Sequence, residues 1–197
     1  MPHRASRRDV ICDAALDLAA EGGNHALTHR GIDARLELAR GSTSYYYRTR
    51  QALVSAAIAR LTQGSSESFR AALPAEPPRS AEEASALITG QLETLVVDRR
   101  RDVLARYALA VDAASEEILR VALASCLFSR PAATTLMDSL GAHDPDGAAR
   151  DLIVLLEGMV FDLTYGSRAL GTDTRFDDHR EPVRQAIALW IGALCTR

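Results

Sequence analysis

Hydroxyl and guanidinium groups are concentrated in one short stretch of the chain, residues 31–50, with the sequence GIDARLELARGSTSYYYRTR. Three adjacent Ser/Thr residues occupy positions 42–44, three adjacent tyrosines occupy positions 45–47, and five arginines lie between positions 30 and 50. Hydroxyl groups donate hydrogen bonds to phosphate oxygens, and guanidinium groups neutralise the charge of those oxygens. Together these residue types favour a surface that binds the phosphate backbone of DNA.

The same residues also admit a plainer interpretation. The Ser/Thr residues 42–44 can be helix caps or solvated positions, and Arg48 and Arg50 can be ordinary surface charges. Side chains on three consecutive residues point in three directions, so at least one of the tyrosines at 45–47 is expected to pack inward. Binding by all three tyrosines is therefore not expected.

Two short helices would position this stretch. Thr28 is a suitable N-cap for a helix that continues to Leu36, and a second helix follows at about 40–46 after a break of three residues. Ile32 and Leu36 would supply the apolar contacts between the two helices, together with Leu38. This arrangement matches a helix-turn-helix, whose second helix can enter the major groove of DNA.

Helical periodicity continues along nearly the whole chain, and no window shows strand alternation bounded by turns. Ser6 with Asp9 forms a predicted capping box for a first helix. Pro131 should kink or split a helix that begins near Ser115. We therefore predict an all-α fold of about nine helices.

Two domains are expected within this fold. Residues 1–50 would form the helix-turn-helix domain, and a helix at about 50–63 would connect it to a second domain at 64–197. The proline-rich segment 74–78, PAEPP, is the best candidate boundary because proline breaks helices.

Charge is distributed unevenly between these parts. The chain has 23 basic residues, all arginine, and a net charge of −3. The first 50 residues carry eight arginines and six acids, whereas the remainder carries fifteen arginines and twenty acids. A mildly basic N-terminal part therefore precedes an acidic body, a weak signal for nucleic-acid binding.

Enzymatic, metal-binding and membrane functions find no support in the sequence. It contains no HExxH, P-loop or nucleotide-binding GxGxxG motif, so we expect no enzymatic activity, no cofactor and no metal site. The three cysteines are isolated, which favours reduced thiols and a cytoplasmic location. We also expect no signal peptide and no membrane span.

The pattern of the first third resembles the DNA-binding head of the TetR (tetracycline repressor) family. AALDLAAEGG, LTHRGID and GSTSYYYRTRQAL occur in the order typical of that family, over roughly residues 7–61. The remaining two-thirds resembles the family only in helical layout and length. The resemblance implies a homodimer that binds double-stranded, palindromic operator DNA and responds to a small-molecule effector.

The resemblance also implies roles for individual residues. Thr28 and His29 would anchor the start of their helix on the DNA backbone. The residues expected to contact DNA in or beside the groove are Arg40, Gly41, Ser42, Ser44, Tyr45, Tyr46 and Arg50. Tyr47 takes the place of a customary phenylalanine and is expected in the core.

Two residues depart from the family pattern. Glu37 stands in the turn where the family usually has glycine, and a non-glycine residue in a left-handed turn costs about 1 kcal/mol. Its carboxylate would also be repelled by DNA. Asp33 replaces a small apolar residue.

The C-terminal helices supply candidates for the effector site and for pairing. The expected lining residues are Leu92, Leu104, Tyr107, Phe128, Met137, Phe161 and Tyr165, with Tyr107 or Arg106 as polar contacts. The final two long helices are expected to pair across a twofold axis through Leu155, Met159, Leu163, Ile187, Trp190 and Leu194. Each of these apolar residues can instead belong to the core of a single protomer.

The sequence therefore predicts a homodimeric, ligand-responsive transcriptional regulator, most simply a repressor. The alternative is a small all-α ligand-binding or adaptor protein without DNA function. The alternative is preferred if Arg50→Ala and Tyr46→Phe leave DNA retention unchanged at low salt.

Overall fold

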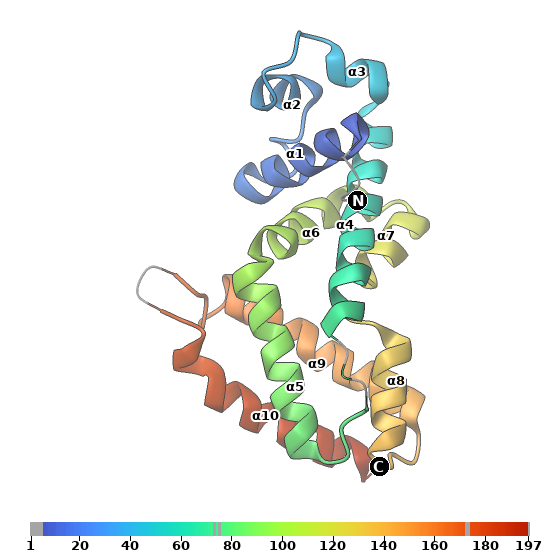
Figure 1. Cartoon of the computed structure of the whole chain (residues 1–197), viewed down its shortest axis with the longest axis vertical. Helices are drawn as coiled ribbons and strands as arrows, with labels where there is room; N and C mark the ends of the chain where they lie inside the picture. The colour runs from blue at the N-terminus through green and yellow to red at the C-terminus, as the bar shows by residue number, and fades with distance from the viewer. Residues whose placement is uncertain (1–5, 73, 75, 172–173, 197) are drawn as a thin grey trace. The chain divides into compact units, whose positions relative to one another are not determined.

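All regular secondary structure in the described part of the chain is helical, as Figure 1 shows for the computed structural model. The structure describes residues 6–72, 74, 76–171 and 174–196, and these residues form no strand. The elements in chain order are α1 (Arg7–Gly22), α2 (His29–Arg35), α3 (Ser42–Tyr46), α4 (Arg50–Ala72), α5 (Ala81–Glu93), the π-helical turn η1 (Thr94–Asp98), α6 (Arg100–Ala113), α7 (Glu117–Ala124), α8 (Arg130–Ser139), α9 (Pro145–Tyr165) and α10 (Asp177–Cys195). The predicted all-α class is confirmed.

Contacts between Cα positions divide the chain into two compact units. The head unit comprises residues 1–68 and 101–126, and the body unit comprises residues 69–100 and 127–197. α6 and α7, which the sequence analysis assigned to the second domain, thus share the compact unit of the helix-turn-helix. Ala75, within the proposed boundary segment 74–78, lies outside the described residues.

The head unit is organised around an apolar core formed by α1, α2, α4, α6 and α7. Ile11, Ile32, Leu53 and Leu109 are each fully buried in this core. Complete burial of one such side chain contributes about 1.5–3 kcal/mol to folding. Because α2 packs against both α1 and α3, the core fixes the two short helices (Figure 1).

Local capping signals place the helix starts as the sequence predicts. Ser6 and Asp9 form the predicted capping box of α1, and the Thr28 hydroxyl accepts a hydrogen bond from Gly31 N at the start of α2. Pro131 lies in the first turn of α8, so the helix predicted from Ser115 is split into α7 and α8. These signals act within a single turn of chain, which is why sequence alone reveals them.

The end of α9 differs from the sequence expectation. The stretch DGAARDLIVLLEGMVFDLTYGSRALG at residues 146–171 predicts a helix that continues to about residue 170, whereas α9 ends at Tyr165. The Asp162 carboxylate accepts a hydrogen bond from Ser167 N and pairs with Arg168 over 2.5 Å, which redirects the chain. A β-carbon at Gly166 would collide with this carboxylate, so glycine is needed there.

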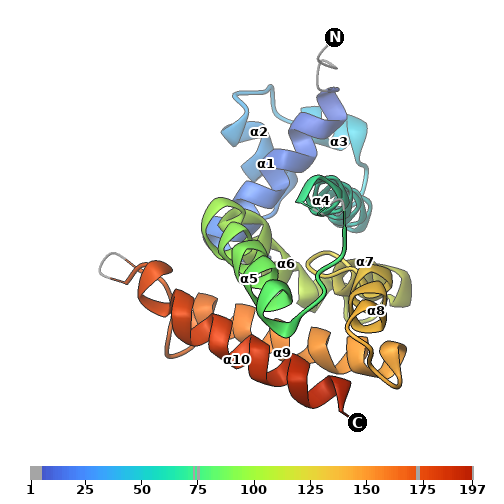
Figure 2. The same ribbon diagram turned by 60° about the horizontal axis from the view of Figure 1, so that its bottom comes forward.

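The body unit consists of two packed helix pairs joined through α9 and α10. α5 packs against α10, α8 packs against α9, and Figure 2 shows α9 and α10 lying along one another. Leu92, Leu152, Leu163 and Ile187 are almost fully buried between these helices. Within the described residues, none of the helices combines the length and apolar character that a membrane span requires.

The turn between α2 and α3 contains the left-handed residue that the sequence predicts. Glu37 has a φ of 52° and is the one non-glycine residue with positive φ among those described. Gly41, directly before α3, has a φ of 93°. The expectation that Glu37 occupies a left-handed conformation is therefore confirmed.

We predict that Glu37→Gly stabilises the protein by about 0.5–1 kcal/mol, because glycine removes the left-handed strain but adds entropy to the unfolded chain. Urea unfolding followed by circular dichroism measures this difference. Glu37→Ala is the matched control, since it removes the carboxylate but keeps the β-carbon. Equal stability of the glycine and alanine variants would contradict the assigned strain.

Candidate nucleic-acid interface and ligand cavity

The position of α3 depends on a carboxylate from α2. Asp33 is 5% exposed, and its Oδ2 accepts a hydrogen bond of 2.8 Å from Gly41 N. Its Oδ1 accepts from Thr43 N at 2.8 Å and from the Thr43 hydroxyl at 2.7 Å. Asp33 thus satisfies free amides at the start of α3, the role of an N-cap residue supplied from a different helix.

The hydrogen bonds of this cap also affect the pKa of Asp33. Burial of the carboxyl group acts to raise its pKa, but hydrogen bonds from the Thr43 hydroxyl and from the Thr43 and Gly41 amides outweigh burial and lower it. The carboxylate is therefore ionised at neutral pH. In the sequence, Asp33 stands out only as a departure from the family pattern, and its capping role could not be recognised there.

The residues predicted to face DNA lie on and around the exposed side of α3. Arg40, Gly41, Ser44 and Tyr45 are exposed, whereas Ser42 and Tyr46 are half-buried. The Tyr45 side chain is 83% exposed, and its ring meets the Tyr46 ring edge to face, with centroids 5.2 Å apart. The Ser42 hydroxyl donates to the carbonyl oxygen of Ala39 over 2.6 Å, so it is already engaged within the turn.

Tyr47 occupies the core, as the sequence predicts. It is 8% exposed, and its hydroxyl lies 3.4 Å from the thiol sulfur of Cys12. Burial, together with the neighbouring thiol, raises the pKa of Tyr47 to about 12. The Arg8 guanidinium lies over the Tyr46 and Tyr47 rings at 5.9 and 5.2 Å from their centroids.

His29, a predicted backbone anchor, holds the two short helices together. Its Nε2 lies 2.6 Å from the carbonyl oxygen of Tyr47, directly after α3. Because a carbonyl oxygen only accepts hydrogen bonds, Nε2 carries the proton of this contact. The ring therefore links the start of α2 to the end of α3.

Arg50, the predicted phosphate contact on α4, is engaged inside the head unit. Its guanidinium pairs with both carboxylate oxygens of Asp112 on α6, at 2.5 and 3.0 Å, and donates to the Asn24 carbonyl at 2.8 Å. This ion pair joins the first turn of α4 to α6. A phosphate contact by Arg50 would require exchange of that carboxylate for phosphate.

Three other arginines around α2 and α3 have no such engagement. Arg30, Arg40 and Arg48 are exposed, and within the described residues none of them pairs with a carboxylate. By contrast, Arg35 forms a two-bond ion pair with Glu21. Exposed, unpaired guanidinium groups can bind phosphate without first giving up a protein partner.

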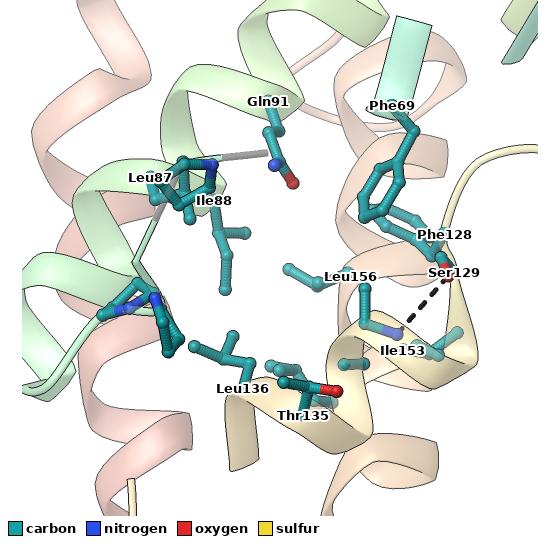
Figure 3. Close-up of a pocket in the computed structure, with 16 residues that line it drawn as sticks. Phe69, Leu87, Ile88, Gln91, Phe128, Ser129, Thr135, Leu136, Ile153 and Leu156 are labelled. Carbon is teal, nitrogen blue, oxygen red and sulfur yellow. Dashed lines mark hydrogen bonds between the residues drawn. The ribbon is translucent and has the colours of Figure 1, made fainter. Parts of the chain in front are cut away.

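The body unit contains an apolar cavity of about 260 Å³ (Figure 3). The end of α4, three prolines at positions 74, 77 and 78, α5, α8 and α9 all contribute to its walls. Its lining residues are Phe69, Pro74, Pro77, Pro78, Leu87, Ile88, Gln91, Phe128, Ser129, Ala132, Ala133, Thr135, Leu136, Leu152, Ile153 and Leu156. Concave apolar sites with few polar groups are typical of small-molecule binding.

The predicted lining residues are distributed over several environments. Phe128 lines the cavity. Leu92 and Met137 are fully buried in the body unit, and Phe161 and Tyr165 are each 52% exposed on α9. Leu104 and Tyr107 belong to the head unit, as does Arg106, whose Nε donates to the Leu123 carbonyl at 2.9 Å.

The residues predicted to pair the protomers are mostly inside a single protomer. Leu155 and Trp190 are half-buried. The other four are at most 6% exposed, because they hold α9 and α10 in their own core: Met159, Leu163, Ile187 and Leu194. The apolar side chains that α9 and α10 direct outward are Val154, Phe161, Tyr165 and Leu189, each at least 52% exposed.

Comparison with known proteins decides the family. Residues 79–193, more than half of the chain, match a family model described as the C-terminal domain of tetracyclin repressor-like proteins. The chain belongs to the TetR family. A search of curated proteins finds no match.

Solved structures of TetR-family and related regulators share this fold. A TetR-family member from Streptomyces coelicolor A3 is 24% identical, with 94% of this chain and 98% of that chain covered and a TM-score of 0.69. A transcriptional regulator from Rhodococcus sp. Rha1 is 20% identical, with 96% of each chain covered and a TM-score of 0.75. The multidrug binding protein EbrR, complexed with ethidium, is 26% identical, with 95% and 99% covered and a TM-score of 0.66.

The TetR-family match and the sequence resemblance cover complementary parts of the chain. The resemblance rests on the head at roughly residues 7–61, whereas the family model matches residues 79–193. The chain thus combines a helix-turn-helix with the C-terminal domain of TetR-family regulators.

Proposed function

We propose that this TetR-family chain is a repressor that binds a palindromic operator as a homodimer and leaves it when a small molecule occupies the body unit. The observation that carries the proposal is the exposed face of α3, which Asp33 fixes to α2. Ser44 and Tyr45 lie exposed on this helix, and Arg40 is exposed just before it. A short helix held at its N-terminus, with polar side chains outward, suits insertion into a major groove.

Each part of the interface has a proposed role. Ser44 and Tyr45, which are exposed, would meet the base edges, and Tyr46 would contact a base methyl or a phosphate beside them. Arg40, with Arg30 and Arg48, would neutralise phosphates on either side of the groove. Thr28 and Gly41 would bring the backbone close to phosphate, since neither side chain is bulky.

Pairing of two protomers would use the outward face of α9 and α10. Val154, Phe161 and Tyr165 follow one another at helical spacing on α9, and Leu189 is 73% exposed on α10. Gly158 and Gly192 also lie exposed on these helices, with no atom near the position of a β-carbon. Large apolar groups beside small ones allow helices of two copies to interlock.

The cavity of the body unit would hold the effector. EbrR is a multidrug binding protein whose structures contain ethidium, proflavin or malachite green, and it shares the fold over nearly the whole chain. The apolar walls of the present cavity suit a small organic molecule. Binding would favour a conformation whose two α3 helices no longer match successive grooves.

Arg40→Ala tests the DNA interface. We expect it to weaken retention on operator DNA about tenfold and to reduce the salt dependence of binding by about one phosphate contact per protomer. Fluorescence anisotropy with labelled DNA at several salt concentrations measures both quantities.

Arg79→Ala is the matched control, because Arg79 is exposed in the body unit and pairs there with Glu76. It should bind DNA like the unmodified protein. Equal binding by both variants, with the salt dependence of each unchanged, would refute the proposed role of Arg40. Failure of the unmodified protein to bind any DNA would favour an adaptor protein without DNA function.

A further inference from the structure

The walls of the cavity in the body unit contain no charged side chain among the described residues that line it. Most of the walls come from leucine, isoleucine, proline, phenylalanine and alanine. The polar lining residues are Gln91, Ser129 and Thr135. Their hydrogen bonds therefore decide which polar groups a ligand can satisfy.

Two of these three polar residues are already engaged. The Ser129 hydroxyl caps α8 by accepting from Ala132 N at 3.4 Å, the contact drawn as a dashed line in Figure 3. The Thr135 hydroxyl donates to the Pro131 carbonyl at 3.1 Å. Each hydroxyl therefore already has one hydrogen-bond partner in α8.

Gln91 is different. Its amide has no hydrogen-bond partner among the described residues, and the side chain is half-buried. Figure 3 shows the amide end directed from α5 into the space between the walls. A carboxamide offers both a donor and an acceptor, so it can bind a hydroxyl, a carbonyl or an amine group of a ligand.

The dimensions of the cavity limit the size of that ligand. An apolar cavity of about 150 Å³ holds a benzene molecule. The present cavity, at about 260 Å³, has room for about two fused rings or an aliphatic group of similar volume.

The same apolar walls disfavour a charged ligand. Moving an ion from water into an apolar site without a counter-charge costs several kcal/mol. No carboxylate or guanidinium group lines the described cavity to offset that cost. A neutral molecule avoids the penalty.

We propose that the cavity binds an uncharged, mainly apolar molecule with a single hydrogen-bonding group, and that Gln91 binds this group. The inference rests on the proposed function for the consequence of binding, because the same molecule would release the operator. The ligand class itself follows from the walls and from Gln91, and its test needs no DNA.

Four naphthalene compounds of closely similar shape provide the test: 2-naphthol, naphthalene, 2-naphthoate and 2-naphthylmethylammonium. Binding to the full-length protein is measured by calorimetry or by ligand fluorescence. We expect 2-naphthol to bind about fivefold more tightly than naphthalene and at least tenfold more tightly than either ion. Failure of all four to bind, or binding of an ion as tightly as 2-naphthol, would overturn the proposal.

Gln91→Leu separates recognition by Gln91 from simple apolar binding. We expect this variant to lose about fivefold in affinity for 2-naphthol and nothing for naphthalene, because leucine keeps the volume without the amide. Gln63→Leu is the matched control, since Gln63 is exposed on α4 in the head unit and should leave both affinities unchanged. Equal losses for both compounds in Gln91→Leu would contradict the assigned role.

Filling the cavity locates the binding site. Ala132→Leu and Ala133→Leu each add bulk to the wall formed by α8 and should weaken 2-naphthol and naphthalene alike. Circular dichroism identifies any variant that fails to fold, and the second variant then replaces it. Undiminished binding by a folded variant would place the ligand elsewhere and overturn the proposal.

Measuring the affinity for operator DNA in the presence of each compound distinguishes this inference from the proposed function. Selective binding of 2-naphthol without any change in DNA affinity would support the ligand class and refute the effector role. Release of DNA by an ion but not by 2-naphthol would support the effector role and refute the ligand class.

Discussion

Asp33→Ala is expected to destabilise the protein by about 2 kcal/mol and to lower its affinity for operator DNA at least tenfold. The substitution leaves the amides of Gly41 and Thr43 and the Thr43 hydroxyl without their acceptor in a buried site, and each unsatisfied group costs about 1–3 kcal/mol before relaxation. The start of α3 would then be free to fray. Urea unfolding and fluorescence anisotropy measure the two losses.

Two further substitutions sharpen this test. Asp33→Asn keeps one acceptor oxygen, so it should lose the bond to Gly41 and show a smaller effect than alanine. Asp138→Ala removes an exposed aspartate of α8 and should change neither stability nor DNA affinity. Stability of Asp33→Ala within about 0.5 kcal/mol of the unmodified protein, a change typical of a surface site, would show that the carboxylate does not hold α3.

The dependence of this effect on pH follows from the pKa of Asp33. The folded-state pKa lies below the ordinary value near 4, so the stabilisation is complete above that value. It is lost as the pH falls through the lowered folded-state pKa. The stability difference between the unmodified protein and Asp33→Ala should therefore be constant from about pH 5 to 8 and should shrink below about pH 4.

Leu189→Glu is expected to convert a dimer into a monomer of 21.3 kDa and to weaken operator binding at least a hundredfold. Leu189 is 73% exposed on α10, so the substitution leaves the fold of the protomer intact. In a paired surface, the same carboxylate would be buried without a partner, which is strongly unfavourable. A monomer binds each half of a palindrome separately and loses the advantage of linkage.

Ile118→Glu is the matched control for Leu189→Glu. Ile118 is 83% exposed on α7 in the head unit and is equally apolar, but it lies on neither α9 nor α10. It should remain dimeric in analytical ultracentrifugation at micromolar concentration. A monomeric unmodified protein, or a Leu189→Glu variant that stays dimeric, would refute pairing through this face.

Features confined to one turn of helix could be predicted from the sequence. The caps Ser6 and Thr28 each accept a hydrogen bond from an amide three residues ahead, and the structure confirms them. Glu37 could be identified as left-handed because its place in the turn pattern was clear. In each case the signal and the structure it determines lie within a few residues.

Features that depend on tertiary contacts could not be predicted in the same way. The Asp33 cap joins residues eight and ten positions apart across the turn, and Arg50 meets Asp112 from 62 positions away. An aspartate in a helix gives no sequence signal that it will cap the next helix. The sequence pattern therefore marked Asp33 as an unfavourable substitution, whereas in the structure its carboxylate stabilises the start of α3.

The outward face of α9 shows the limit of periodicity. This helix is apolar on more than one side, because Leu152 and Leu163 are buried while Val154 and Phe161 are exposed. Helical spacing alone identifies both sides as apolar and cannot say which side meets the core of the same protomer. The lining of the cavity likewise depends on tertiary contacts, because five separate segments of the chain contribute to it.

Selection of bound DNA from a random pool, repeated at 50 and 200 mM salt, tests the central claim most directly. Two heads that each neutralise about three phosphates should select a palindromic consensus, with affinity about a thousandfold lower at the higher salt concentration. Enrichment of no sequence, or of a consensus without twofold symmetry, would contradict a dimeric operator-binding regulator.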